Sequence, residues 1–64
     1  MKEALINRII ERREQLGISK MDMSKRLEMS YFGYRRLENG ENVGVDVIVK
    51  ACEELGLEIK INIK

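Results

Sequence analysis

Four side chains in the middle of this chain have the chemistry needed to contact the edges of DNA bases. They are Tyr31, Phe32, Arg35 and Arg36. An arginine can donate two hydrogen bonds to O6 and N7 of guanine, and an aromatic edge can press on the methyl group of thymine. Two adjacent aromatic side chains could instead form a protein-binding patch, and Phe32 alone could pack against its own domain.

These side chains belong to the second of two short predicted helices, residues 20–27 and residues 31–38. Each helix has an apolar stripe at helical spacing, formed by Met23 and Leu27 in the first and by Tyr34 and Leu37 in the second. We expect Met21 to add to the packing of the first helix. Ser30 is a suitable N-cap for the second helix, and Gly40 suits a left-handed stop after it. Two helices joined by a three-residue turn form a helix-turn-helix, with the four candidate side chains facing outward.

The stretch resembles the helix-turn-helix of the Cro/cI-type (XRE) family of phage and bacterial repressors. The resemblance covers about two thirds of the chain and depends on the joint spacing of Leu16-Gly17-Ile18-Ser19, Leu27, Ser30 and Leu37-Glu38-Asn39-Gly40. Three positions depart from the family pattern. Ser24 stands where a small alanine is usual, Glu28 where a glycine usually forms the turn, and Gly33 lies inside the second helix.

The resemblance implies roles for residues at matching positions. Tyr31, Phe32 and Arg36 match base-contacting positions, and Arg35 shares their outward face. The positions that match or adjoin phosphate-contacting ones are Ser19, Lys20, Asn39 and Asn42. For Lys20 the alternative is an ordinary solvated lysine.

The resemblance also implies a structural ion pair. Arg13 follows the apolar positions Ile9 and Ile10 by one turn, and in the family an arginine here pairs with the glutamate that ends the second motif helix, here Glu38. Such a partly buried pair would fix the relative pose of two helices. Without the resemblance, the default interpretation is a solvated arginine on a helix flank.

Two further helices are predicted to complete the domain. Residues 3–16 carry a broad apolar face that includes Leu16, and residues 45–55 carry a buried stripe that includes Cys52. We interpret Cys52 as a small core residue, because no histidine is available to activate it as a nucleophile. The expected fold is therefore mostly α, with a four-helix Cro/cI-like domain over residues 1–56.

The last eight residues, 57–64, change from helical periodicity to strict alternation, which predicts a β-strand. This segment is similar to the antitoxin-type branch of the family, whose dimers share a sheet of C-terminal strands. A lone strand has no partner elsewhere in the chain, so we expect it to pair with the same strand of a second copy. The expected dimer interface is Leu57, Ile59, Ile61 and Ile63. Antiparallel pairing centred on Ile61 is favoured over pairing centred on Lys60, which would place two lysines opposite each other.

Length and composition limit the other possibilities. The chain has 64 residues, one cysteine and no histidine. A chain this short buries only about 60% of its unfolded surface, so we expect oligomerisation to contribute to stability. One cysteine forms no internal disulfide, and the common zinc sites need histidine or more cysteines, so we expect no metal and no cofactor. Nothing resembles a signal peptide or a membrane span, which predicts a soluble cytoplasmic protein.

The charge is distributed unevenly although the net charge is only +1. Residues 18–37 contain five basic and two acidic side chains, a local charge of +3, whereas the rest has seven basic and nine acidic, a charge of −2. This asymmetry suits a small positive footprint for DNA on an otherwise acidic body. A mixed-charge helical surface can also show such a fluctuation by chance.

These observations favour one function and leave a second open. An enzyme is disfavoured, because the chain lacks histidine, a phosphate-binding glycine loop and an acid pair in a plausible cleft. The favoured function is a sequence-specific double-stranded DNA-binding regulator, a repressor that acts as a homodimer on an operator with residues 31–38 in the major groove. The alternative is an antitoxin or adaptor that binds a toxin or another protein and also regulates its own operon.

Overall fold

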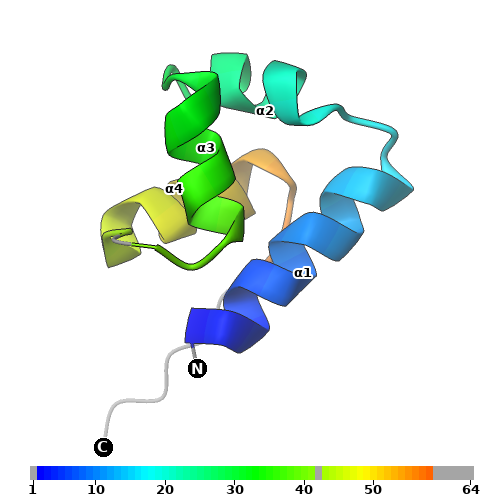
Figure 1. Cartoon of the computed structure of the whole chain (residues 1–64). Helices are drawn as coiled ribbons and strands as arrows, with labels where there is room; N and C mark the ends of the chain where they lie inside the picture. The colour runs from blue at the N-terminus through cyan, green and yellow to red at the C-terminus, as the bar shows by residue number, and fades with distance from the viewer. Residues whose placement is uncertain (1, 42, 59–64) are drawn as a thin grey trace, which may run out of the picture.

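The computed structural model describes residues 2–41 and 43–58, which form four α-helices (Figure 1). These are α1 (Lys2–Gln15), α2 (Lys20–Arg26), α3 (Tyr31–Glu38) and α4 (Val45–Glu54). The predicted four-helix fold is confirmed, and the predicted helix ends differ from the observed ones by one residue at most. α2 and α3 form the helix-turn-helix, with α3 turning steeply away from α2 (Figure 1).

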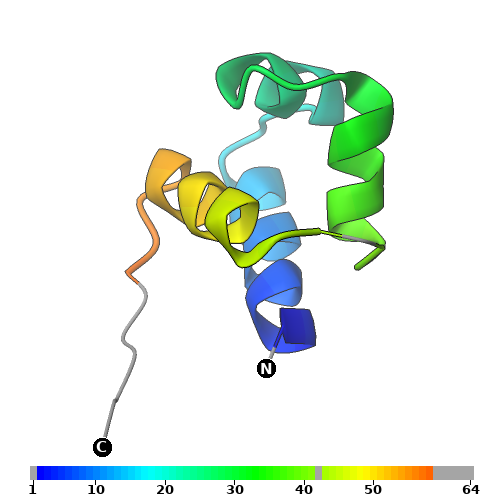
Figure 2. The same ribbon diagram turned by 90° about the vertical axis from the view of Figure 1, so that its left-hand side faces the viewer.

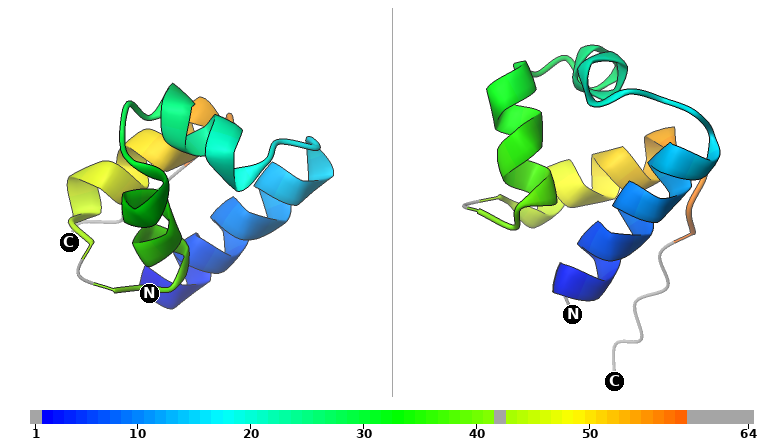
Figure 3. Two further views of the ribbon diagram at one scale, coloured as in Figure 1. Left: turned by 45° about the horizontal axis from the view of Figure 1, so that its top comes forward. Right: turned by 45° about the vertical axis from the view of Figure 1, so that its right-hand side comes forward.

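One hydrophobic core lies between the four helices. α4 lies against α1, and α2 closes the opposite end of the core above α3 (Figures 2 and 3). Tyr34 of α3 is completely buried at its centre. The remaining buried apolar residues come from all four helices and their connections: Ile6, Ile9, Ile18, Met23, Leu27, Leu37, Ile48, Ala51, Cys52 and Leu55.

Serine residues begin both helices of the motif. The Ser19 hydroxyl accepts a hydrogen bond of 3.0 Å from the Asp22 amide, and the Ser30 hydroxyl accepts one of 3.0 Å from the Gly33 amide. Each serine has an extended backbone, as an N-cap requires. The two caps fix where α2 and α3 start, and therefore which residues of α3 face outward.

All four helices end in the same hydrogen-bonded stop. In α1, for example, the Ile18 amide donates to the Arg13 carbonyl and the Gly17 amide donates to the Glu14 carbonyl, both at 3.1 Å. This Schellman motif needs a left-handed residue just after the helix, and three of the four helices use glycine there. α2 uses Glu28, which at φ 55° is the one non-glycine residue with positive φ among the described residues.

Two apolar side chains are more exposed than the sequence predicted. Leu16 is 46% exposed and Met21 is 48% exposed. Leu16 lies just after the last residue of α1, where the chain already turns away from the core. Met21 lies two residues from the inward-facing Met23, which places it on nearly the opposite side of α2. Their predicted packing roles are therefore wrong.

The predicted C-terminal strand lies almost entirely outside the described residues. Only Leu57 and Glu58 are described, and neither belongs to a strand. Leu57 is half-buried and packs against the core, and its amide donates to the Cys52 carbonyl at 2.8 Å as part of the stop of α4. Within the described residues, no helix has both the length and the apolar character needed to cross a membrane.

Candidate nucleic-acid interface

The outward face of α3 carries a cluster of aromatic and basic side chains. Phe32 is 72% exposed, the highest value among the exposed large hydrophobic residues, and Tyr31 beside it is half-buried. The two rings meet edge to face, with centroids 6.0 Å apart and an interplanar angle of 67°. The guanidinium of Arg35 lies over the Tyr31 ring, 6.0 Å from its centroid. We call Tyr31, Phe32 and Arg35 the aromatic cluster.

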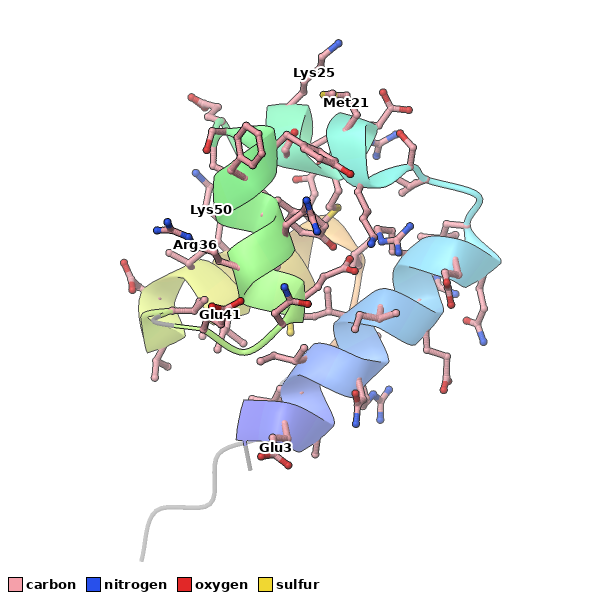
Figure 4. The ribbon with its side chains drawn as sticks, in the orientation of Figure 1. Glu3, Met21, Lys25, Arg36, Glu41 and Lys50 are labelled. Carbon is pink, nitrogen blue, oxygen red and sulfur yellow. The ribbon has the colours of Figure 1, made fainter. Side chains whose placement is uncertain are left out.

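Arg36 lies next to this cluster on α3 and points away from the body of the domain (Figure 4). It is exposed, and it forms no ion pair with any described residue. Lys25 of α2 also projects into solvent at the α2 end of the molecule, whereas the acidic Glu3 lies at the far end of α1 (Figure 4). Basic groups therefore stand free on the motif, where an anionic surface could reach them.

The predicted phosphate-contacting residues lie at two places beside α3. Ser19 and Lys20 lie at the start of α2, where both are exposed. Asn39 lies just after α3 and is exposed, and its amide nitrogen donates to Glu41 Oε2 at 3.3 Å. Asn42 lies outside the described residues. The start of α2 and the end of α3 therefore both expose polar side chains.

A buried ion pair joins α1 to α3 behind this face. Arg13 Nε donates to Glu38 Oε2 at 2.7 Å, and the two side chains are only 8% and 6% exposed. Arg13 Nη1 also donates to the Ile18 carbonyl at 2.8 Å. Burial lowers the pKa of Arg13, but the hydrogen bond and the charge of Glu38 outweigh it, so the pKa is raised. The guanidinium is therefore charged and is held by two elements at once.

Tyr34 completes this region, which we call the buried joint (Arg13, Tyr34 and Glu38). Its hydroxyl is buried and has no hydrogen-bond partner among the described residues. Burial, together with the nearby Glu38 carboxylate, raises the pKa of Tyr34, so the hydroxyl stays protonated. The joint holds α3 against α1, and through α3 it sets the pose of the outward face.

The sequence matches the helix-turn-helix family over residues 9–61, most of the chain. The chain belongs to this family of Cro/cI-type (XRE) DNA-binding proteins. Comparison with curated proteins and with solved structures found no significant match. Family membership makes the protein a transcription regulator that binds double-stranded DNA, and the family's members are not enzymes.

The structure shows the local geometry at each of the three departures from the family pattern. Ser24 is 2% exposed, and its hydroxyl donates to the Met21 carbonyl at 2.6 Å, so the extra polar group is satisfied within α2. Glu28 adopts the left-handed conformation that glycine usually supplies. A Cβ atom at the third departure, Gly33, would lie 3.1 Å from the Ser30 hydroxyl oxygen, so glycine there leaves room for the N-cap.

Two cationic side chains close helix ends in ways that the sequence did not predict. Lys50 Nζ of α4 donates to the carbonyl of Leu27 at the end of α2 at 3.5 Å. Arg12 Nε of α1 donates to the carbonyl of Leu55 at the end of α4 at 3.3 Å. Both contacts join residues far apart in the chain, so no local pattern signals them.

The thiol of Cys52 is buried in the hydrophobic core. Cys52 is 1% exposed, and burial raises the pKa of its thiol. The residues that the structure describes contain no group of three or more His, Cys, Asp or Glu side chains that could hold a metal ion.

Proposed function

We propose that the protein is a sequence-specific repressor that binds its operator as a homodimer, with α3 in the major groove. One observation carries the proposal: the outward face of α3 presents two aromatic rings and two arginines, all free of the domain's own core. These residue types fit thymine methyl groups and guanine edges. The exposed polar residues at the start of α2 and at the end of α3 would contact the phosphate backbone.

The dimer is proposed from the C-terminal segment 57–64. Its alternating apolar residues Leu57, Ile59, Ile61 and Ile63 would pair with those of a second copy and face the helices of both. Each apolar side chain contributes about 1.5 to 3 kcal/mol if fully buried, a total comparable with the stability of a small domain. Two subunits would place their α3 helices in half-sites about 34 Å apart. As a repressor it would act in the cytoplasm.

Operator binding is best tested by a gel shift on the region upstream of the protein's own gene, at several salt concentrations. We expect a shift that is stronger than on random DNA of equal length and that weakens steeply as salt rises, because bound arginine and lysine displace counterions. Equal binding to both DNAs at every salt concentration would contradict sequence-specific function.

The dimer has its own test. Deleting residues 57–64, or the single substitution Ile61→Asp, should give a monomeric or unfolded protein by sedimentation and remove operator binding at physiological salt. Asn62→Asp is a matched control, because it adds the same charge at a position expected to face water. A truncated protein that stays a folded dimer would exclude the strand as the interface.

A second function is suggested by the exposed Phe32 beside Tyr31, because two adjacent outward aromatic side chains could form part of a protein-binding patch. In this alternative the protein is an antitoxin or adaptor whose aromatic cluster binds another protein, and it also regulates its own operon. Co-expression with the products of neighbouring genes tests it. Phe32→Ser should then abolish co-purification of the partner, whereas Arg36→Ala should weaken DNA binding only.

A further inference from the structure

We propose that Tyr31 reads the 5-methyl group of a pyrimidine, so that the protein selects thymine or 5-methylcytosine over cytosine at one position of each half-site. The inference depends on the proposed DNA-binding function and assigns a ligand group to one side chain. In it, Tyr31 contacts the base, and Arg35 acts as a positioning residue that holds the Tyr31 ring.

The first step of the argument is that the Tyr31 ring is already held in place. Phe32 meets it edge to face with centroids 6.0 Å apart, and the Arg35 guanidinium lies 6.0 Å from its centroid. Tyr31 is half-buried, whereas Phe32 is 72% exposed. A side chain fixed before binding loses little conformational entropy when it meets its ligand, so its contacts contribute more to selectivity.

The second step is the chemistry of the groove. The C5-methyl group of thymine is the one apolar group that the standard base pairs present in the major groove, and cytosine lacks it. An aromatic ring contacts that methyl group favourably and gains nothing from cytosine. The adjacent atom differs between the two methylated bases, O4 in thymine and N4–H₂ in cytosine. A tyrosine hydroxyl can donate to the first or accept from the second.

The third step assigns different roles to the two arginines. Arg35 lies over the Tyr31 ring, one turn further along α3, whereas the structure shows no such contact for Arg36. A cation over an aromatic face is stabilised by the ring, which keeps Arg35 on Tyr31. Arg36 is therefore the side chain available for guanine. It lies five residues after Tyr31, a rise of about 7.5 Å along the helix and a rotation of about 140° around it, so the two side chains would reach different bases.

The proposal thus defines a recognisable site: a methylated pyrimidine and a separate guanine in the same half-site. Binding sites can be selected from a pool of random duplexes with the full-length protein, after which the selected thymines are replaced one at a time. Replacing the recognised thymine by uracil should weaken binding about fourfold, which corresponds to about 0.8 kcal/mol for one methyl-sized group. Unmodified cytosine there should be at least as poor as uracil, and 5-methylcytosine should restore most of the loss.

Variants test which residue is responsible, because neither Tyr31 nor Arg35 belongs to the buried core. Tyr31→Ser should bind thymine and uracil duplexes equally. Arg35→Met should reduce the thymine-to-uracil ratio, and Arg35→Lys should restore part of it because the cation is kept. Lys20→Ala is the matched control, since it should weaken both duplexes alike and leave the ratio unchanged.

The possible failures are distinguishable. A selection that yields no preferred sequence overturns both the proposed function and this inference. A clear preferred sequence in which every thymine can be replaced by uracil without loss overturns the inference alone. The inference alone is also overturned if Tyr31→Ser keeps the wild-type ratio. Protection of Tyr31 and Phe32 by a protein partner and not by DNA would overturn both the inference and the proposed placement of α3 in the major groove.

Discussion

The protein uses the same two residue types, arginine and tyrosine, in two opposite settings. In the buried joint, Arg13 is paired with a carboxylate and the Tyr34 hydroxyl has no partner among the described residues. In the aromatic cluster, Arg35 lies over the face of Tyr31 and both side chains reach solvent. The two settings differ in their access to water, which solvates the exposed groups but not the buried ones. A buried charge requires a partner, whereas an exposed one can be left available for a ligand.

The largest expected effect comes from breaking the buried joint. Arg13→Ala leaves the Glu38 carboxylate buried without its partner, which should lower the free energy of unfolding by about 3 to 5 kcal/mol. Urea unfolding followed by circular dichroism measures this. The matched control on the exposed side is Arg35→Ala, which should change stability by less than about 0.5 kcal/mol.

A double substitution sharpens this prediction. Arg13→Met combined with Glu38→Leu removes both charges, so it should be much less destabilising than Arg13→Ala. If the double variant were as unstable as the single one, packing volume and not the unpaired charge would explain the loss.

The next largest effect is on DNA binding by the exposed side chains of α2 and α3. Arg36→Ala should cost about 1 to 3 kcal/mol of binding to the operator and relax the preference at one base pair, whereas Lys20→Ala should weaken all DNA alike. Fluorescence anisotropy on operator and random duplexes measures both. Equal losses on the two DNAs for both variants would rule out the base-reading role of Arg36.

Removing a tyrosine hydroxyl should change the free energy of unfolding differently in the two settings. Tyr34→Phe deletes a buried group without a described hydrogen-bond partner and should raise the free energy of unfolding by about 1 kcal/mol. Tyr31→Phe, on the surface, should leave it nearly unchanged. Thermal melts of both variants give the answer, and a clear fall for Tyr34→Phe would indicate a hydrogen bond to the joint.

The stability difference between wild type and Tyr34→Phe should depend on pH. The folded state raises the pKa of Tyr34 above its ordinary value of 10.0, so the folded protein holds this proton more tightly than the unfolded one. That contribution to stability is complete below pH 10 and is lost as the pH rises above it. Tyr34→Phe should therefore lose less stability than wild type above pH 10.

The smallest expected effect is at the turn between α2 and α3. Glu28→Gly should stabilise the domain by about 0.5 to 1 kcal/mol, because glutamate at φ 55° is strained and glycine is not. Glu28→Ala is the control, since it removes the charge and keeps the strain. A lower melting temperature for the glycine variant would show that the Glu28 side chain itself stabilises the turn.

The sequence predicted the helices well because their signals are local. Ser19 and Ser30 start α2 and α3, and glycines end α1, α3 and α4, within the few residues that each cap involves. The apolar stripes predicted the core except at Leu16 and Met21, which stay exposed. Leu16 lies just after the last residue of α1, and Met21 lies about 200° around α2 from the buried Met23, so neither belongs to the inward stripe of its helix.

The candidate site was less predictable. The outward direction of α3 follows from the buried positions Tyr34 and Leu37, so the reading face could be predicted. The stacking of Arg35 on Tyr31 could not, because the i, i+4 spacing permits that contact without requiring it. The contacts of Arg12 and Lys50 were not predicted, because their partners are backbone carbonyls on distant elements. Every residue has a backbone carbonyl, so the residue type of the partner gives no signal.

Those two carbonyl contacts couple the helices during local opening. The carbonyl of Leu27, the C-cap of α2, accepts from Lys50 of α4, and the carbonyl of Leu55, the C-cap of α4, accepts from Arg12 of α1. Cations at these negative helix ends stabilise them, and α2, with seven residues, is too short to persist alone. Partial unravelling of α4 would therefore also release the end of α2. Amide hydrogens in the two helices should exchange with deuterium at one common opening free energy, as a single cooperative unit.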